Sequence, residues 1–543
     1  MIAVERGVAV EKGMSTKGKI LTALALLTLT GLGLGLVHPA WWWSLLLIGP
    51  LWAVALHDLL QRRRTLLRNY PVLGHGRYLI EDFRHHFRQY LIESDLGGAP
   101  FSHEQRALVY RRAKGVNDVL PFGTLNNVYA SGHEWLNHSM QPRNAPAEET
   151  RIPVGGPDCE QVYPASHFNI SALSFGSLSS HAILALNGGA ARGGFYHNTG
   201  EGGICRYHRE YGGDLVWEIG SGYFGCRTPD GGFDPEQFRD KARSDQVRMI
   251  EIKISQGAKP GGGGVLPASK LTPELAEARS VPLGRDVLSP ASHSEFDSPV
   301  GLVRFIARLR ELSGGKPVGI KLCLGRRVEF MATVKAMLAE SITPDFITVD
   351  GAEGGTGAAT LELSNAVGMP LRDALVYVHN SLYGAGLRDR VRIIAGGKVV
   401  SAFDIARSLA LGADLCNSGR GMMFALGCIQ ARKCETNRCP TGVATQNPLL
   451  ASGLSVPDKI ERVHRYHRNT IRHLLELTAA TGFERPEQLG PHLFHRRLDP
   501  RTVVSYQDLF PWLESGELLD GGSADPWYAE PWQRARAESF RAA

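Results

Sequence analysis

Two uncharged, apolar stretches stand near the start of the chain. The first runs from Ile20 to Val37 and the second from Ala40 to His57. Each has the roughly 18–20 residues that a helix needs to cross a hydrocarbon core. The pattern predicts a transmembrane hairpin within residues 20–60.

The charges around these stretches predict their orientation. Lys17 and Lys19 precede the first stretch, and Arg62, Arg63 and Arg64 follow the second. Positive flanks stay in the cytoplasm, so both ends of the hairpin are expected there, with its tryptophan-rich turn at the far interface. A cleaved signal peptide is the alternative for the first stretch, but the second stretch and the lack of a suitable cleavage site disfavour it. We therefore expect an inner (cytoplasmic) membrane protein whose main domain faces the cytoplasm.

From about Val162 onward, short apolar runs alternate with amphipathic stretches, which is typical of strands followed by helices in a parallel sheet. Eight candidate strands predict an α/β protein with a closed (β/α)8 TIM barrel. They are Phe168–Ala172, Gly193–Asn198, Leu215–Ile219, Met249–Ile254, Val318–Leu322, Phe346–Val349, Val391–Ala395 and Asp414–Asn417.

These patterns divide the chain into five parts. A basic amphipathic helix is expected near Lys459–Leu477, beyond the barrel. The parts are a cytoplasmic segment 1–19, the hairpin 20–60, a linker or cap 61–150, the barrel with its cysteine loop 151–450, and a C-terminal helical extension 451–543.

Glycine-containing loops follow six of the eight predicted strands. The loops read S-F-G-S-L-S after the first strand, T-G-E-G-G after the second, S-Q-G-A-K-P-G-G-G-G after the fourth, G-A-E-G-G-T-G after the sixth, G-G-K after the seventh and S-G-R-G after the eighth. Tight turning alone is one explanation. However, all these loops meet at the carboxyl face of a barrel, where active sites lie, so a bound cofactor is favoured.

The loops after the last two predicted strands indicate which kind of cofactor binds. Backbone amides of Gly396, Gly397, Lys398, Gly419 and Arg420 are expected to form a phosphate cradle. A phosphate-bearing flavin or pyridoxal would fit it.

Three cysteines and a buried-strand lysine favour the flavin. Cys428, Cys434 and Cys439 form C-x5-C-x4-C with Pro440 directly behind. The pattern favours an iron–sulfur cluster over zinc or three unrelated buried thiols, with Cys416 as a fourth ligand only if the fold brings it near. A flavin beside a cluster links two-electron to one-electron chemistry. Lys321, within a predicted strand, is expected to face the flavin ring.

The composition and net charge of the chain exclude few classes of function. The net charge of +6 and a pI near 8.8 are mildly basic, and no run of basic residues with interleaved aromatics indicates nucleic-acid binding. The other cysteines are scattered without disulfide-like spacing, which agrees with a reducing cytosol.

The loop motifs, in this order, resemble one family. They are S-A-L-S-F-G-S-L-S from Ser171, N-T-G-E-G-G from Asn198, E-I-K-I-S-Q-G-A-K-P-G from Glu251, G-G-T-G-A from Gly354, and the cysteine run ending C-P-T-G-V-A-T-Q at Gln446. The stretch from about Val162 to Pro448 is similar to the flavin-binding synthase domain of glutamate synthase. Tyr207 to Gly225 is more similar to the shorter, stand-alone FMN-binding members.

The resemblance implies an FMN-binding barrel with a three-iron, four-sulfur cluster on Cys428, Cys434 and Cys439. It implies that reduced flavin delivers hydride to 2-iminoglutamate, made from 2-oxoglutarate and ammonia, and yields L-glutamate. The implied flavin contacts are Ser174, Phe175, Gly176, Ser177, Lys321 and Gly355.

It also implies roles in catalysis. Gln256 would face the reactive side of the flavin, and Lys253 and Lys259 would serve flavin or substrate carboxylates, although each could be a solvated loop lysine. Glu201 would orient the substrate nitrogen or cap a helix. His293 is either a proton donor or structural.

The chain also departs from the large enzyme of this family. It begins with Met-Ile-Ala rather than a catalytic cysteine, and the Pro260–Gly264 loop lacks a carboxylate. No credible dinucleotide site appears. We therefore expect an external electron donor and a possible separate ammonia-supplying subunit.

The function predicted is that of a glutamate synthase-like oxidoreductase acting on CH–NH2 donors. Two other classes stay open. One is a membrane flavin and iron–sulfur electron carrier acting on quinones or another imino or oxo acid. The other is a binding or scaffold protein that has kept the barrel without its chemistry.

Overall fold

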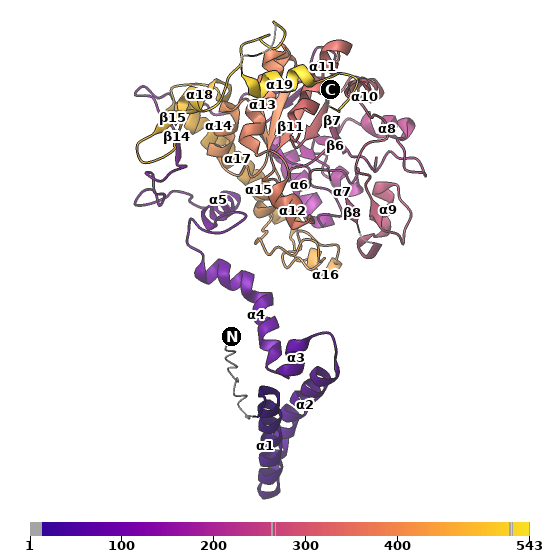
Figure 1. Cartoon of the computed structure of the whole chain (residues 1–543), viewed down its shortest axis with the longest axis vertical. Coiled ribbons are helices and arrows are strands. Elements are labelled where there is room, and N and C mark those ends of the chain that lie inside the picture. Colours follow the sequence, from indigo (N-terminus) through magenta and orange to yellow (C-terminus); the bar gives the residue numbers. More distant parts are fainter. Residues whose placement is uncertain (1–13, 262–263, 267, 521–522, 524, 542–543) are drawn as a thin grey trace, which may run out of the picture. The chain divides into compact units, whose positions relative to one another are not determined.

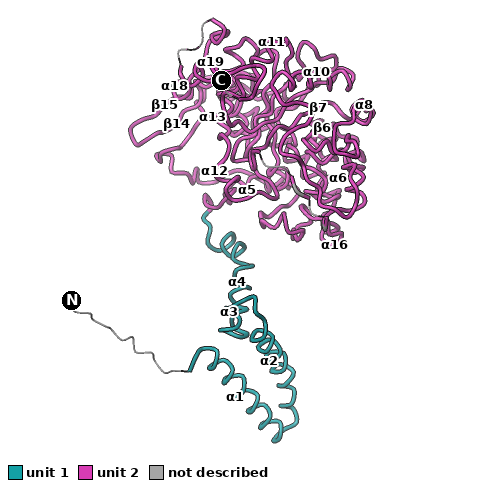
Figure 2. The backbone as a smooth tube through the Cα atoms, turned by 45° about the vertical axis from the view of Figure 1, so that its right-hand side comes forward, with its two compact units in different colours: residues 1–94 teal, residues 95–543 magenta. Residues whose placement is uncertain are grey.

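The computed structural model describes residues 14–261, 264–266, 268–520, 523 and 525–541. The chain forms two compact units, residues 1–94 and 95–543 (Figure 2), and each is described by itself.

The first unit is helical. Its long helices are α1 (Thr16–Val37), which Ser15 caps, and α2 (Leu45–Leu60), joined by the 3-10 turn η1 (Pro39–Ser44). Trp52 Nε1 donates to Thr28 Oγ1 at 2.9 Å and joins the two helices. The segments Thr16–Val37 and Pro39–Leu60 are long and apolar enough to cross a membrane, by length and composition. Three short helical segments follow: α3 (Thr65–Asn69), α4 (Gly74–Phe87) and the π-helix η2 (Arg88–Ile92).

The second unit is built on a closed barrel of eight parallel strands (Figure 1). The strands follow one another in chain order, and the eighth, β13, pairs with the first, β4. They are β4 (Phe168–Ile170), β5 (His197–Asn198), β6 (Leu215–Ile219), β7 (Val247–Lys253), β10 (Val318–Leu322), β11 (Phe346–Asp350), β12 (Arg392–Gly396) and β13 (Leu415–Ser418).

The predicted barrel is confirmed, although several strand boundaries differ by one or two residues from those predicted. The largest difference is at the second strand. The sequence pattern starts the second strand at Gly193. Instead α6 runs through Gly193 and ends with Gly194 in the left-handed region, at φ +64°, so the strand begins at His197. The reason is that the G-G pair ends a helix with a left-handed glycine cap, which a strand pattern does not reveal.

The helices outside the barrel are capped by residues that the sequence supplies. Ser179 caps α6 and Ser401 forms a capping box on α14. The long helices are α6 (Ser180–Gly193), α8 (Pro235–Ala242), α10 (Pro299–Ser313), α11 (Arg327–Glu340), α13 (Leu371–Gly384), α14 (Ala402–Ala410) and α17 (Val456–Ala480). The other helices are α7 (Arg206–Arg209), α9 (Pro273–Arg279), α12 (Leu361–Ala366), α15 (Arg420–Ala425), α16 (Pro448–Ala451), α18 (Tyr506–Leu509) and α19 (Pro526–Arg534), with 3-10 turns at Ala268–Lys270, Arg388–Arg390, Pro486–Gln488 and Pro491–Leu493.

Segments on either side of the barrel sequence pack onto it. The helix α5 (His103–Lys114) packs against α15 and α17, and α17 packs against α6 and α14. β1 (Glu134–Leu136) pairs with β14 (Phe494–Arg497), which pairs with β15 (Val503–Ser505).

One end of the barrel interior is filled by a hairpin. Its strands, β2 (Ile152–Val154) and β3 (Tyr163–Ala165), share an apolar cluster with inward residues of the barrel such as Met249 and Phe346. A further short pair, β8 (Val265–Leu266) and β9 (Val287–Leu288), forms a ribbon after β7. The hairpin leaves the other end, at the carboxyl termini of the strands, for a site.

Candidate functional site

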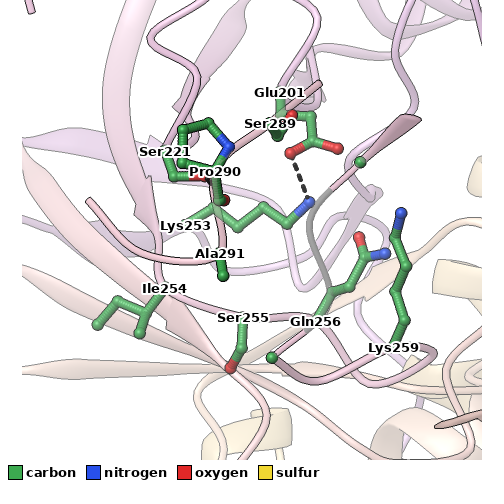
Figure 3. A pocket seen from close by; sticks show the side chains of 12 residues that line it. Glu201, Ser221, Lys253, Ile254, Ser255, Gln256, Lys259, Ser289, Pro290 and Ala291 are labelled. Carbon is green, nitrogen blue, oxygen red and sulfur yellow. Dashed lines mark hydrogen bonds and ion pairs between the residues drawn. The ribbon is translucent and has the colours of Figure 1, made fainter. Parts of the chain in front are cut away.

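A small pocket, partly open to solvent, lies beyond the carboxyl end of β7 (Figure 3). It contains all four residues predicted to be catalytic, and loops after β5, β6 and β7 contribute to it. The lining residues are Glu201, Ser221, Lys253, Ile254, Ser255, Gln256, Lys259, Gly261, Gly264, Ser289, Pro290 and Ala291.

Glu201 and Lys253 form an ion pair across this pocket. Lys253 ends β7, and its Nζ lies 3.0 Å from Glu201 Oε2. Burial would raise the pKa of Glu201, but the Lys253 cation outweighs it and lowers the pKa to about 2. The carboxylate is therefore ionised throughout the neutral range.

Two further cations lie beside the pair. Burial lowers the pKa of both Lys259 and Arg279. Arg279, the last residue of α9, is 7% exposed, and its Nε has no hydrogen-bond partner among the described residues. Its charge acts on Glu201. Two lysines and one carboxylate thus line the pocket, and Arg279 adds a further positive charge, so the local charge favours an anion.

Arg279 is not evident from the sequence. An arginine at the end of a short amphipathic helix is typical of a surface residue, and no local signal distinguishes it. Its place becomes evident only in the fold, where a Cβ on Gly176 or Gly202 would come within 3.2 or 3.4 Å of its Nη2. Two glycine loops thus close over one buried guanidinium.

Lys321 lies inside the barrel and is paired. Its Nζ is 2.9 Å from Glu218 Oε2. Burial alone would lower the pKa of Lys321, but Glu218 raises it overall, so the lysine is a cation. Glu218, for which the sequence predicts no role, offsets the cost of burying this charge.

A second buried carboxyl group lies near this pair. Burial raises the pKa of Glu251 to about 7. Its oxygens accept from Thr348 Oγ1 at 2.6 Å and Asn198 Nδ2 at 2.7 Å. Burial therefore favours the protonated form of this carboxyl group inside the barrel.

His293 has a structural position. Its Nδ1 lies 3.1 Å from Tyr223 Oη and its Nε2 lies 2.9 Å from the carbonyl oxygen of Lys253. Both ring nitrogens are engaged, and burial lowers the pKa of the ring. The histidine holds the end of β7 in place.

The loop after β4 is closely packed. Ser174 Oγ lies 3.0 Å from Ser177 Oγ, and Gly176 has φ +101°. The Phe175 ring is buried edge-on against Tyr207, at 5.1 Å between centroids. Among the four residues of this loop predicted to contact the flavin, Phe175 thus directs its ring into the protein core.

The loops after β12 and β13 provide amide donors. The N–H groups of Gly397, Lys398 and Gly419 donate no hydrogen bond to any described residue. Gly397 and Lys398 have positive φ, +138° and +52°. Three unpaired amides at adjacent strand ends, next to Gly396 and Arg420, fit a phosphate group.

The predicted cysteine ligands lie in one loop whose backbone turns sharply. Gln430, Arg432 and Asn437 all have positive φ, between +56° and +61°. The thiols of Cys428, Cys434 and Cys439 are free, and they act electrostatically on one another. Among the residues that the structure describes, no group of three or more His, Cys, Asp or Glu side chains is arranged to hold a metal ion.

Residues before the barrel support this loop. Tyr110 Oη donates to the Cys428 carbonyl at 2.6 Å, and Gln430 exchanges two hydrogen bonds with the backbone of Phe101. The segment predicted to be a linker or cap therefore packs against the cysteine loop and forms hydrogen bonds with it. Cys416 lies within β13, next to Ser408 of α14, and not in this loop.

Gln446 connects the cysteine loop to the loop after β4. Its side-chain amide donates to the carbonyls of Leu178 at 2.8 Å and Gly176 at 3.3 Å.

The Pro260–Gly264 loop, where the sequence lacks a carboxylate, is described only in part. Gly262 and Gly263 lie outside the described residues.

Comparison with known proteins places the chain in context. Residues 139–484 match the family model described as the conserved region in glutamate synthase. The glutamate synthase large subunit-like protein YerD of Bacillus subtilis is 37% identical over 492 residues, which cover 83% of this chain and 93% of that protein.

More distant similarities are also found. The archaeal-type glutamate synthase (NADPH) of Thermotoga neapolitana is 33% identical over 320 residues, and the match covers 59% of this chain and 60% of that protein. A crystal structure of mandelate oxidase matches with a TM-score of 0.40 and 15% identity, covering 74% of this chain and 97% of that one. That structural likeness is too low to support an argument about function.

Proposed function

The chain belongs to the glutamate synthase family, and from this premise we propose that it is an FMN-dependent oxidoreductase that forms L-glutamate from 2-oxoglutarate and ammonia. The observation that carries the proposal is the pocket in which the Glu201–Lys253 pair lies beside Lys259, with Gln256 in the lining. In the net reaction, 2-oxoglutarate, ammonium, two electrons and two protons give glutamate and water.

The residues of the pocket suit a dicarboxylate. Lys253 and Lys259 line the pocket and can bind carboxylates, and the buried Arg279 adds a positive charge that acts on Glu201. Glu201, held ionised by Lys253, can accept a hydrogen bond from the substrate nitrogen and favour its protonated, electrophilic form. Gln256 lies beside Lys259 in the pocket lining and can orient the bound substrate (Figure 3).

The barrel mouth fits FMN. The unpaired amides of Gly397, Lys398 and Gly419 would hold its phosphate, and the Lys321 cation would face its ring. When bound, FMN would supply hydride-transfer chemistry for reduction of the imino acid. Glu218 keeps Lys321 charged and in place.

The three thiols of the cysteine loop are the type of ligand that an iron–sulfur cluster takes, although their side chains are not arranged around a single metal ion in this structure. The backbone N–H of Gln430 donates to Cys428 Sγ at 3.4 Å, and such a donor stabilises a thiolate. Cys428, Cys434 and Cys439 would hold a three-iron, four-sulfur centre, which passes single electrons. An external electron donor and a separate source of ammonia complete the proposal.

We further propose that the α1–α2 hairpin anchors the protein in the cytoplasmic membrane with the barrel in the cytoplasm. The length and apolar character of both segments support this, together with the basic residues at both ends of the hairpin.

An anaerobic assay tests the proposed reaction. The purified chain receives 2-oxoglutarate, ammonium and a chemically reduced viologen, and L-glutamate is measured. We expect glutamate to form only with all three present. Viologen oxidation by quinones without glutamate would support the electron carrier instead, and a colourless protein after reconstitution would support the scaffold.

A further inference from the structure

Arg420 lies between the loop after β11 and the cysteine loop. Its Nη2 donates to the carbonyl oxygen of Thr356 at 2.7 Å. Its Nη1 points to two sulfurs, Met423 Sδ at 3.4 Å and Cys434 Sγ at 3.9 Å. The guanidinium is thus engaged with the cysteine loop, while only its backbone amide belongs to the phosphate cradle.

Glycines of the β11 loop make this arrangement possible. A Cβ on Gly355 would come within 3.0 Å of Arg420 Nε, and a Cβ on Gly357 would lie 3.6 Å from Cys434 Cβ. A side chain at Gly355 would therefore displace the guanidinium. The absence of a side chain in the G-G-T-G sequence thus leaves room for the side chain of Arg420.

The charge of Arg420 reaches more than one predicted ligand. It acts on Cys428 as well as lying next to Cys434. Thiolates that hold a cluster carry negative charge, and each added electron increases it. A nearby cation with N–H donors to sulfur stabilises the reduced, more negative form more than the oxidised form.

We infer that Arg420 is a positioning residue that raises the reduction potential of the iron–sulfur centre held by Cys428, Cys434 and Cys439, and that ties this centre to the β11 loop at the barrel mouth. The inference rests on the proposed function, because it requires the cluster. It assigns to this side chain a role distinct from phosphate binding.

The test compares three variants of the full chain in detergent: Arg420→Gln, Arg420→Lys and the matched control Arg438→Gln. Arg438 is exposed, is in the same loop and adjoins Cys439. Iron, sulfide and flavin contents are measured first. The midpoint potential of the cluster is then determined by electron paramagnetic resonance during titration with dithionite and ferricyanide.

We expect Arg420→Gln to keep its flavin and to lower the potential, so that the reduced-to-oxidised ratio at a fixed solution potential falls about tenfold, which is 59 mV for one electron. Arg420→Lys should fall between wild type and Arg420→Gln, and Arg438→Gln should match wild type. Loss of the cluster in Arg420→Gln alone also supports the inference.

Three outcomes overturn it: an unchanged potential in Arg420→Gln, an equal shift in Arg438→Gln, or loss of the cluster in both Arg420 variants. A wild-type chain without iron would instead refute the proposed cluster itself, so the two failures are distinguishable.

Discussion

Glu201 and Lys253 meet at 3.0 Å although they belong to different loops of the barrel, one after β5 and the other at the end of β7. The cation keeps a largely buried carboxyl group ionised. The charge of Glu201 therefore depends on Lys253, and this dependence leads to the first prediction.

Replacing Lys253 with methionine is expected to lower kcat/KM for 2-oxoglutarate by roughly 100-fold. The change removes a cation from the pocket and leaves Glu201 buried without its partner, so the pKa of Glu201 rises toward the neutral range. The measurement is glutamate formation as a function of pH, and a new loss of activity on the acid side should appear.

Lys335→Met is the matched control, because this lysine lies on α11 and donates to the carbonyl of Ala535, outside the pocket lining. Equal activity in Lys253→Met and wild type would contradict the role given to the pair.

Replacing Gly397 with alanine is expected to weaken FMN binding about tenfold or more. At φ +138° an alanine is strained, and the shift in the backbone moves an amide of the phosphate cradle. Quenching of flavin fluorescence on binding measures Kd.

Gly386→Ala also places an alanine at positive φ, here +68°, with open space around its Cβ, and is not in the cradle. It should destabilise the fold by about 1–2 kcal/mol without changing Kd. A matching loss of affinity in this control would show that strain, and not the cradle, is responsible.

Replacing Cys434 with serine is expected to abolish the electron paramagnetic resonance signal of the cluster while FMN stays bound. The flavin contacts come from other loops, so they persist. Cys159→Ser serves as the control, since Cys159 lies next to Gly315 and apart from the cysteine loop. An undiminished signal in Cys434→Ser would refute its assignment as a ligand.

A pH dependence of stability is expected from His167. Its Nδ1 lies 3.1 Å from Glu149 and its Nε2 lies 3.0 Å from Glu487. Burial would lower the pKa of His167, but the two carboxylates raise it to about 9, against an unfolded value of 6.5. The charged histidine therefore stabilises the fold fully below about pH 6.5, and this contribution disappears as the pH rises through 9.

The free energy of unfolding should fall by on the order of 3 kcal/mol over this range, because each unit of pKa difference between the folded and unfolded states is worth about 1.4 kcal/mol. Urea unfolding followed by tryptophan fluorescence between pH 6 and 10 measures it. His167→Gln should unfold more easily at pH 6 and show a flatter profile over this range. An unchanged slope in that variant would assign the pH dependence to other groups.

Much of the fold follows from local patterns. The apolar runs from Phe168 to Asn417 predict the eight strands, because a strand in a parallel barrel is buried on both faces and needs a short continuous run of β-forming side chains. The glycine loops and the spacing of Cys428, Cys434 and Cys439 also lie within single short segments, so the order of residues alone reveals them.

Pairings between distant segments depend on the tertiary structure. Glu218 with Lys321, Arg279 beside Glu201, Tyr110 under Cys428 and the sulfur contacts of Arg420 all join residues that are far apart in the chain or whose side-chain directions are set by packing. Local sequence limits the conformations of the backbone, but only closure of the barrel brings separate strand ends to one rim. The chemistry of the site therefore emerges from tertiary contacts, where burial decides which charges need partners and which remain for a ligand.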